Sequence, residues 1–146
     1  MQKTYNVFIS SASRDKELVR DLTERLEQVP GVRAFSDKKS VAGEDWTEEV
    51  KRAIEHSDEV LYLVTEHTLK QPSHLAFEVG LSESLEKPIT PILLGVESER
   101  VPAVLADHQA VKWSRLKDYI DGLKQRVQLQ TEGPVSKRAT KHGARA

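Results

Sequence analysis

Apolar residues follow two alternating patterns along the chain, short continuous runs and longer stretches at helical spacing. The runs have the length of strands and lie at Thr4–Ser10, Val32–Phe35, Glu59–Thr65, Ile89–Leu94 and Gln109–Trp113. Apolar residues spaced for one helix face predict helices over Asp15–Val29, from Asp45 as N-cap, over Pro72–Lys87 and Val101–Asp107, and from Leu116. Five successive strand–helix units favour one parallel sheet with helices on both faces.

In sheets of this kind, ligands bind beyond the carboxyl ends of the strands. Three segments should meet there: Ser10–Arg14, Ser36–Glu44 and Thr65–Glu78. The serines of the first segment suit a phosphate, or equally the capping of the next helix. The second segment is long and polar and contains a glycine, which fits either a linker or a mobile contact loop. A binding site at this edge is therefore the working hypothesis.

Glu78 is the leading functional candidate, within PSHLAFEVGLSESLEK. Helical spacing, with Ser73 as the expected N-cap, places its carboxylate beside Leu75 and Val79, near the boundary between the packed face and solvent. Spacing alone also fits an ordinary surface acid that favours helix formation. Its position after the third strand of the series favours the functional interpretation.

The composition limits the classes to which this protein can belong. The chain has 146 residues, 38% hydrophobic and 31% charged, which suits one globular domain. No apolar run approaches the roughly 20 residues of a membrane span. The beginning of the sequence lacks the apolar region of a secretory signal, and cysteine is absent, which excludes disulfides and thiolate metal sites. A cytoplasmic location fits these features.

Charge is unevenly distributed. Residues 131–146 carry four basic and one acidic side chain, a net +3, which leaves −4 on the remaining residues. We therefore predict a domain over 1–129 and a basic, disordered tail over 130–146. An acidic domain argues against nucleic-acid binding as its main function.

Several strong motifs are missing. Neither GxGxxG nor GxxxxGK[ST] occurs, so the dinucleotide fingerprint and the P-loop are excluded. Ser10, Ser11 and Thr65 stand where a phospho-accepting receiver needs acids. The five histidines lack metal-ligand spacing, so no metal site is expected. His67 and His74 lie near the expected site, but fit a surface or helix-start position better than that of a catalytic base.

A set of motifs, in their order and spacing, resembles the bacterial type of TIR (Toll/interleukin receptor) domain. The motifs are VFISSASRDKELVRDLTERLEQVPGVRAFSD (Val7–Asp37), GEDW (Gly43–Trp46), AIEHSDEVLYLVT (Ala53–Thr65), the S-x-x-x-x-E of Ser73 and Glu78, and PITPILL. The resemblance covers about Thr4–Leu129. It implies a flavodoxin-like three-layer α/β sandwich with a five-stranded parallel sheet.

The resemblance also implies site residues. Glu78 matches the family's catalytic glutamate, and the loop from Asp37 to Glu44, with Gly43, matches the loop that contacts a neighbouring copy in assemblies. The expected substrate-binding residues are Phe8, Ser10, Ser11, Arg14, Lys38, Trp46 and His74. Bacterial members often have a tryptophan where this chain has His74. That change puts the rate and the substrate preference in question.

The implied activity is cleavage of NAD+, as a substrate, between nicotinamide and ribose. This resembles standalone TIR proteins of antiphage defence, which self-associate and whose nucleotide product acts on a separate effector. A fixed, partly desolvated carboxylate suits this reaction because positive charge develops on the ribose. Two alternatives stay open: a non-catalytic TIR–TIR interaction module, and another glycosidic-bond enzyme such as a nucleoside deoxyribosyltransferase.

Overall fold

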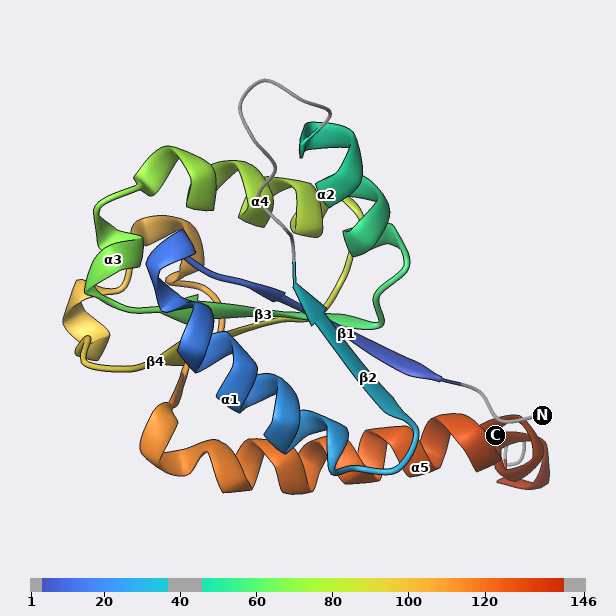
Figure 1. Ribbon diagram of the computed structural model, residues 1–146. Coiled ribbons are helices and arrows are strands. Elements are labelled where there is room, and N and C mark those ends of the chain that lie inside the picture. The colour runs from blue at the N-terminus through green and yellow to red at the C-terminus, as the bar shows by residue number, and fades with distance from the viewer. Residues whose placement is uncertain (1–3, 37–45, 141–146) are drawn as a thin grey trace.

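The computed structural model describes residues 4–36 and 46–140, with the backbone alone at 46, 47, 74 and 131–140. Five parallel strands form one sheet in the order β2-β1-β3-β4-β5 (Figure 1). The strands are β1 (Tyr5–Ser10), β2 (Val32–Ser36), β3 (Glu59–Val64), β4 (Ile89–Leu93) and β5 (Val111–Lys112). The predicted parallel α/β fold is confirmed, with each strand within two residues of its expected bounds.

Helices cover both faces of the sheet, as Figure 1 shows. One face carries α1 (Lys16–Glu27) and α5 (Leu116–Thr140), and the other carries α2 (Trp46–Glu55) and α4 (Pro72–Ser84). A short helix, α3 (Glu66–Leu69), follows β3, and 3-10 turns lie at η1 (Ser13–Asp15), η2 (Ser98–Arg100), η3 (Ala103–Leu105) and η4 (Trp113–Arg115).

The central strand β3 divides the core in two. All six of its residues are buried. Leu61 and Leu63 pack with α1 and α5, whereas Val60, Tyr62 and Val64 pack with α2 and α4. This alternation explains the continuous apolar run in the sequence, because a parallel strand covered on both faces has no side that favours polar residues.

Several helix boundaries differ from those expected. The N-cap of α4 is Gln71, with Pro72 at the first helical position, instead of Ser73. Proline fits there because the first turn has no partner for its missing N–H. The helix expected over Val101–Asp107 is reduced to the turn η3. The proposed N-cap Asp45 lies outside the described residues.

The last helix continues past the expected domain end. The sequence predicts a domain boundary at residue 129, whereas α5 runs on to Thr140. The helix thus enters the segment expected to be disordered. Among the residues whose side chains are described, Leu116, Tyr119, Leu123 and Val127 pack it on the sheet. No described helix combines the length and apolar character needed to cross a membrane.

Candidate active site

The Glu78 carboxylate is buried at the carboxyl edge of the sheet. Leu75, Glu78, Val79 and Ser82 recur at helical spacing on α4 and form its buried stripe. Glu78 is 2% exposed, so it lies deeper than the boundary position that its spacing suggested. Because burying a carboxylate is costly unless polar groups compensate it, this position marks Glu78 as more than a surface acid.

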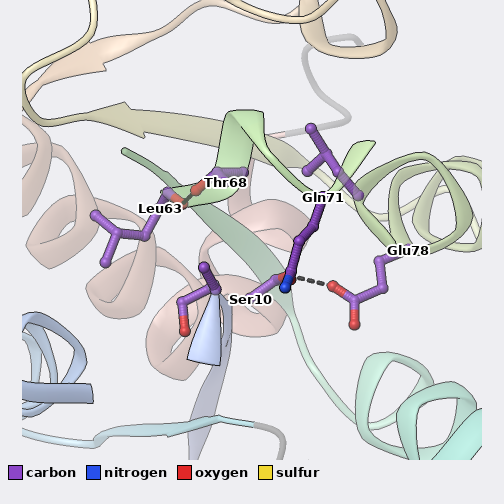
Figure 2. A pocket seen from close by; sticks show the side chains of 8 residues that line it. Ser10, Leu63, Thr68, Gln71 and Glu78 are labelled. Atoms are coloured by element: carbon purple, nitrogen blue, oxygen red, sulfur yellow. Dashed lines mark hydrogen bonds between the residues drawn. The ribbon is translucent and has the colours of Figure 1, made fainter. Parts of the chain in front are cut away.

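Ser10 holds the Glu78 carboxylate. It is the last residue of β1, and its hydroxyl donates a hydrogen bond to Oε1 of Glu78. Ser10 is itself 6% exposed. The hydrogen bond crosses from the central part of the sheet to α4, so two elements far apart in the sequence fix the carboxylate (Figure 2).

A pocket opens beside this pair. Figure 2 shows the Gln71 side chain lying near Ser10 and Glu78, with Leu63 and Thr68 on the β3 side. The lining residues are Ser10, Ser11, Ala12, Leu63, Thr68, Gln71, Leu75 and Glu78. The pocket is partly open to solvent, and its volume is about 20 Å³, which is room for roughly one water molecule. A ligand much larger than water therefore requires the lining groups to move.

Two expected pocket residues, Ser10 and Ser11, do line this space with Glu78. Phe8 is not among the lining residues: its side chain is fully buried in the core and packs on Phe35, with ring centroids 5.6 Å apart, and its role in substrate binding stays a prediction. Phe8 shares the face of Ser10 but lies two residues deeper along β1, so α2 and α4 cover it. The first strand therefore reaches the pocket only through its end.

The other expected residues are placed as follows. Arg14 is exposed on η1 and is not among the residues that line the pocket. Trp46 begins α2 and His74 lies in α4, but the side chains of both are outside the described part. Lys38, Asp37 and Gly43 fall wholly outside the described residues. Their roles stay predictions.

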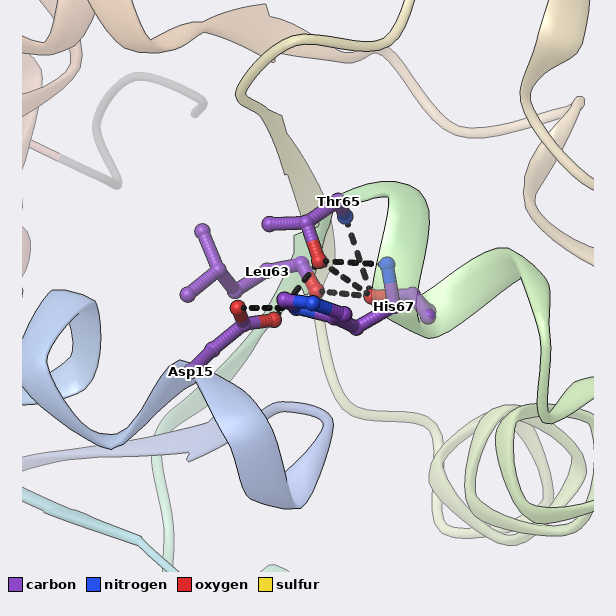
Figure 3. A network of polar contacts seen from close by, with 5 residues as sticks. Asp15, Leu63, Thr65 and His67 are labelled. Carbon is purple, nitrogen blue, oxygen red and sulfur yellow. Dashed lines mark hydrogen bonds and ion pairs between the residues drawn. The ribbon is translucent and has the colours of Figure 1, made fainter.

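A second polar network joins the loops after β1 and β3 (Figure 3). Asp15 is 4% exposed and accepts hydrogen bonds from the Thr65 hydroxyl at 2.6 Å and from Nδ1 of His67 at 3.0 Å. The Thr65 hydroxyl also accepts from the backbone N–H of His67, and Thr68 Oγ accepts from the N–H of Thr65. These bonds fix the short helix that carries Thr68 into the pocket wall.

Sequence reasoning missed Asp15 and Gln71. Asp15 appeared as one charged residue among many in a loop and helix start, and its burial depends on the distant Thr65. Gln71 precedes a proline and carried no motif. The proline after it is the one available signal, because proline is common at the first position of a helix. Neither the bond between Asp15 and Thr65 nor the place of Gln71 in the pocket wall follows from spacing along the chain.

An exposed ion pair lies at the start of α3, the short helix that follows β3. Arg100 on η2 donates two hydrogen bonds to Glu66 at the start of α3. These hydrogen bonds lower the pKa of the Glu66 carboxyl. Solvent screens this pair, so it contributes little to stability. Within the described residues, no three His, Asp or Glu side chains gather as a metal ion would require.

The strand order and the buried carboxylate define a flavodoxin-like α/β protein with a candidate site at its sheet edge. The family comparison then places the chain more closely. A sequence model described as "TIR domain" matches residues 7–127, and the protein belongs to the TIR-domain family. The match includes both Ser10 and Glu78.

Solved structures share this fold at low sequence identity. The TIR domain of the Toll-related receptor TRR-2 from Hydra magnipapillata has a TM-score of 0.66 at 24% identity, with 86% of this chain and 99% of that chain covered. The TIR domains of the activated Roq1 resistosome, which recognises the pathogen effector XopQ, have a TM-score of 0.54 at 22% identity, with 67% and 62% covered.

A third similar structure is an enzyme. The 2-deoxyribosyltransferase of Bacillus psychrosaccharolyticus has a TM-score of 0.58 at 16% identity, with 79% of this chain and 90% of that chain covered. At these identities the likeness shows the fold alone. No curated protein matches the sequence.

Proposed function

We propose that the protein cleaves NAD+ at the bond between nicotinamide and ribose, with Glu78 as the catalytic carboxylate. The observation that carries this proposal is a glutamate, 2% exposed, that Ser10 holds beside a pocket at the carboxyl edge of a TIR-domain sheet. A buried carboxylate in a pocket is a poor stabiliser of the fold and a good stabiliser of a developing cation.

The reaction needs charge stabilisation more than proton transfer. As the C–N bond breaks, its electron pair goes to the pyridine nitrogen, nicotinamide leaves neutral, and positive charge stays on the ribose. The Glu78 carboxylate stabilises that charge in the transition state more than in the ground state. Water then adds to the ribose carbon and loses a proton to solvent, which gives ADP-ribose. Attack by an adenine nitrogen instead gives a cyclic product.

The pocket must change conformation before the substrate can enter. The pocket of about 20 Å³ is much smaller than a nicotinamide riboside. Gln71 is exposed and lies near the carboxylate, so its movement would widen the entrance (Figure 2). We propose that self-association, through the loop over Asp37–Glu44, favours the open form. Activity is then expected to rise with protein concentration.

The biological setting follows from the same proposal. A nucleotide product, or the loss of NAD+, would act in antiphage defence in the cytoplasm, where a separate effector protein responds to the product. The resistosome whose TIR domains share this fold recognises a pathogen effector. Linear and cyclic products are both compatible with the site.

One observation favours a second function, a TIR–TIR interaction module without catalysis. Glu78 is almost inaccessible, and the pocket beside it has room for about one water molecule. A chain that only associates with other TIR domains needs no access to this carboxylate. The two functions differ in whether assembled protein releases nicotinamide.

The test compares wild-type protein with Glu78→Gln. Each is incubated with NAD+ over a range of protein concentrations, and nicotinamide release is followed by chromatography. We expect the variant to lose on the order of a hundredfold or more of the rate. Glu83→Gln is the matched control, because this acid lies on the same helix with its side chain 51% exposed, and we expect it to keep the wild-type rate.

Absence of nicotinamide above the Glu78→Gln background, in protein that light scattering shows to be assembled, would refute the enzymatic proposal and support the interaction module. A parallel incubation with a deoxynucleoside and a free base tests the deoxyribosyltransferase alternative. Base exchange there, without NAD+ cleavage, would replace the proposed substrate class.

A further inference from the structure

Tyr62 and Ser10 are neighbours across the sheet. They are register partners on the adjacent parallel strands β3 and β1, and both face the layer of α2 and α4. Ser10 donates to the Glu78 carboxylate. Tyr62 reaches the same helix one turn further on, where its hydroxyl lies 2.7 Å from Oγ of Ser82. Two paired strand positions therefore contact the helix that carries Glu78.

Ser82 connects Tyr62 to the main chain of Glu78. Its hydroxyl donates a hydrogen bond of 2.9 Å to the backbone carbonyl of Glu78. A serine has a single hydroxyl proton, so with that proton on the carbonyl, the Tyr62 hydroxyl is the donor to Ser82. The direction of the chain is thus Tyr62 to Ser82 to the Glu78 carbonyl.

All members of this chain are removed from water. Tyr62 is 1% exposed and Ser82 is 0% exposed. Burial, with a smaller effect of the nearby Glu78 carboxylate, raises the pKa of the Tyr62 hydroxyl well above its usual range, although its hydrogen bond with Ser82 acts in the opposite direction. Tyr62 therefore keeps its proton and stays a donor across the physiological pH range.

We propose that Tyr62, acting through Ser82, is a positioning residue for Glu78. Ser10 fixes the carboxylate and the Tyr62–Ser82 pair fixes the backbone of the same residue, so Glu78 is held from the sheet at both ends. The buried hydroxyls resist rotation or lifting of this turn of α4. The catalytic part of this inference rests on the proposed NAD+ cleavage, whereas the holding of Glu78 does not.

The first measurement needs no activity. The ¹³C signal of the Glu78 side-chain carboxyl reports whether Ser10 still donates to it, and the Ser10→Ala variant supplies the reference for loss of that bond. We expect Tyr62→Phe and Ser82→Ala to move the signal toward the reference position. Tyr119→Phe is the control, since it removes a buried hydroxyl that bonds Glu59 at the opposite edge, and we expect no movement.

The second measurement is kinetic. We expect Tyr62→Phe and Ser82→Ala each to lower kcat for NAD+ cleavage on the order of tenfold, with KM unchanged, because small displacements of a catalytic group are costly. The double variant should be no slower than either single one, since both changes break one chain. Tyr119→Phe should keep the wild-type kcat even where its melting temperature falls.

The outcomes separate the two proposals. An unmoved carboxyl signal in both Tyr62→Phe and Ser82→Ala overturns the positioning role, whatever the activity. A moved signal with an unchanged kcat overturns its catalytic importance. If the wild-type protein cleaves no NAD+ but the carboxyl signal moves in the variants, the proposed function is overturned and the positioning of Glu78 is supported. If Tyr62→Phe does not fold, Ser82→Ala alone decides.

Discussion

Two glutamates of this protein are almost equally buried and have different surroundings. Glu59 is 3% exposed and Glu78 is 2% exposed. Glu59 begins β3, at the amino edge of the sheet, and Glu78 lies on α4 at the carboxyl edge. The same side chain at the same depth thus occurs at both ends of one sheet.

The surroundings of Glu59 compensate its charge. Tyr5 and Tyr119 each donate a hydrogen bond to it at 2.5 Å, and Arg126 donates two more at 3.0 and 3.1 Å. The guanidinium also lies 5.3 Å from the centre of the Tyr119 ring. This cluster joins β1, β3 and α5. Its hydrogen bonds and ion pair serve the stability of the fold.

Among the contacts that the described residues make, Glu78 accepts from a hydroxyl and borders a pocket. Ser10 donates to its carboxylate, and the pocket wall includes both residues. Burial alone therefore does not identify a functional acid. The position at the carboxyl edge, where the loops of parallel strands converge, together with an adjoining pocket, separates the candidate catalytic residue from the structural one.

The largest effects are expected from changing each glutamate to glutamine. Glu59→Gln should lower the free energy of unfolding by about 3 kcal/mol, because Arg126 and two hydroxyls lose a shared anionic acceptor. Glu78→Gln should change it by less than about 1 kcal/mol, since the amide oxygen still accepts from Ser10 and a buried charge is removed. Urea unfolding followed by circular dichroism measures both.

The rates should show the opposite order. Folded Glu59→Gln is expected to keep nicotinamide release at the wild-type level, in contrast to Glu78→Gln. Equal losses of stability in the two variants would remove the distinction between the two edges, as would a loss of activity in Glu59→Gln at temperatures where it is folded.

A smaller effect is expected from Ser10→Ala. Without the hydroxyl, the carboxylate loses the donor that orients it, and we expect kcat for NAD+ cleavage to fall about ten- to a hundredfold. The control is Ser57→Ala, which removes another buried hydroxyl, bonded to the carbonyl of Ile54 at 2.7 Å. It should cost about 1 kcal/mol of stability and leave the rate unchanged. Equal rates in the two variants would argue against orientation by Ser10.

The smallest effect concerns alkaline pH. The chain has three tyrosines, and burial raises the pKa of Tyr5, Tyr62 and Tyr119, with Glu59 adding to the effect on the first and last. A raised pKa in the folded state means that their contribution to stability is complete below about pH 10, the unfolded value, and is lost as the pH rises above it.

We therefore expect phenolate absorbance to appear together with unfolding during an alkaline titration, while a native circular dichroism spectrum persists through pH 10. Ionisation of the tyrosines near pH 10 in folded protein would show that water reaches the clusters at both edges. Tyr119→Phe and Tyr62→Phe assign the signal to one edge or the other.

Much of the fold could be predicted because local pattern and tertiary role agree. The continuous apolar run of Glu59–Thr65 predicted a strand, and all of β3 is buried. The start of a helix was harder to predict where two neighbouring residues both suit the first turn. Ser73 suits an N-cap, yet Pro72 already starts the helix, since fixed backbone geometry at the first position outweighs a capping hydroxyl.

The candidate site could be predicted only in outline. The place of Glu78 after the third strand indicated the correct sheet edge. The partners of the buried acids could not be predicted, since Ser10 and Glu78 are 68 residues apart and Tyr5 and Glu59 are 54 apart. The depth of Phe8 could not be predicted either, because alternation along a strand gives the face of a side chain, but not how far the covering helices reach.

The sequence by itself determined the order of strands and helices, the parallel sheet and the resemblance to TIR domains, because these depend on periodicity and on motifs read along the chain. Only the tertiary structure decided which of two buried glutamates is paired with an arginine and which faces a pocket. The physical reason is that the solvation and pairing of a carboxylate depend on groups brought together by folding. Glu78 and Glu59 look alike in the sequence and differ in what surrounds them.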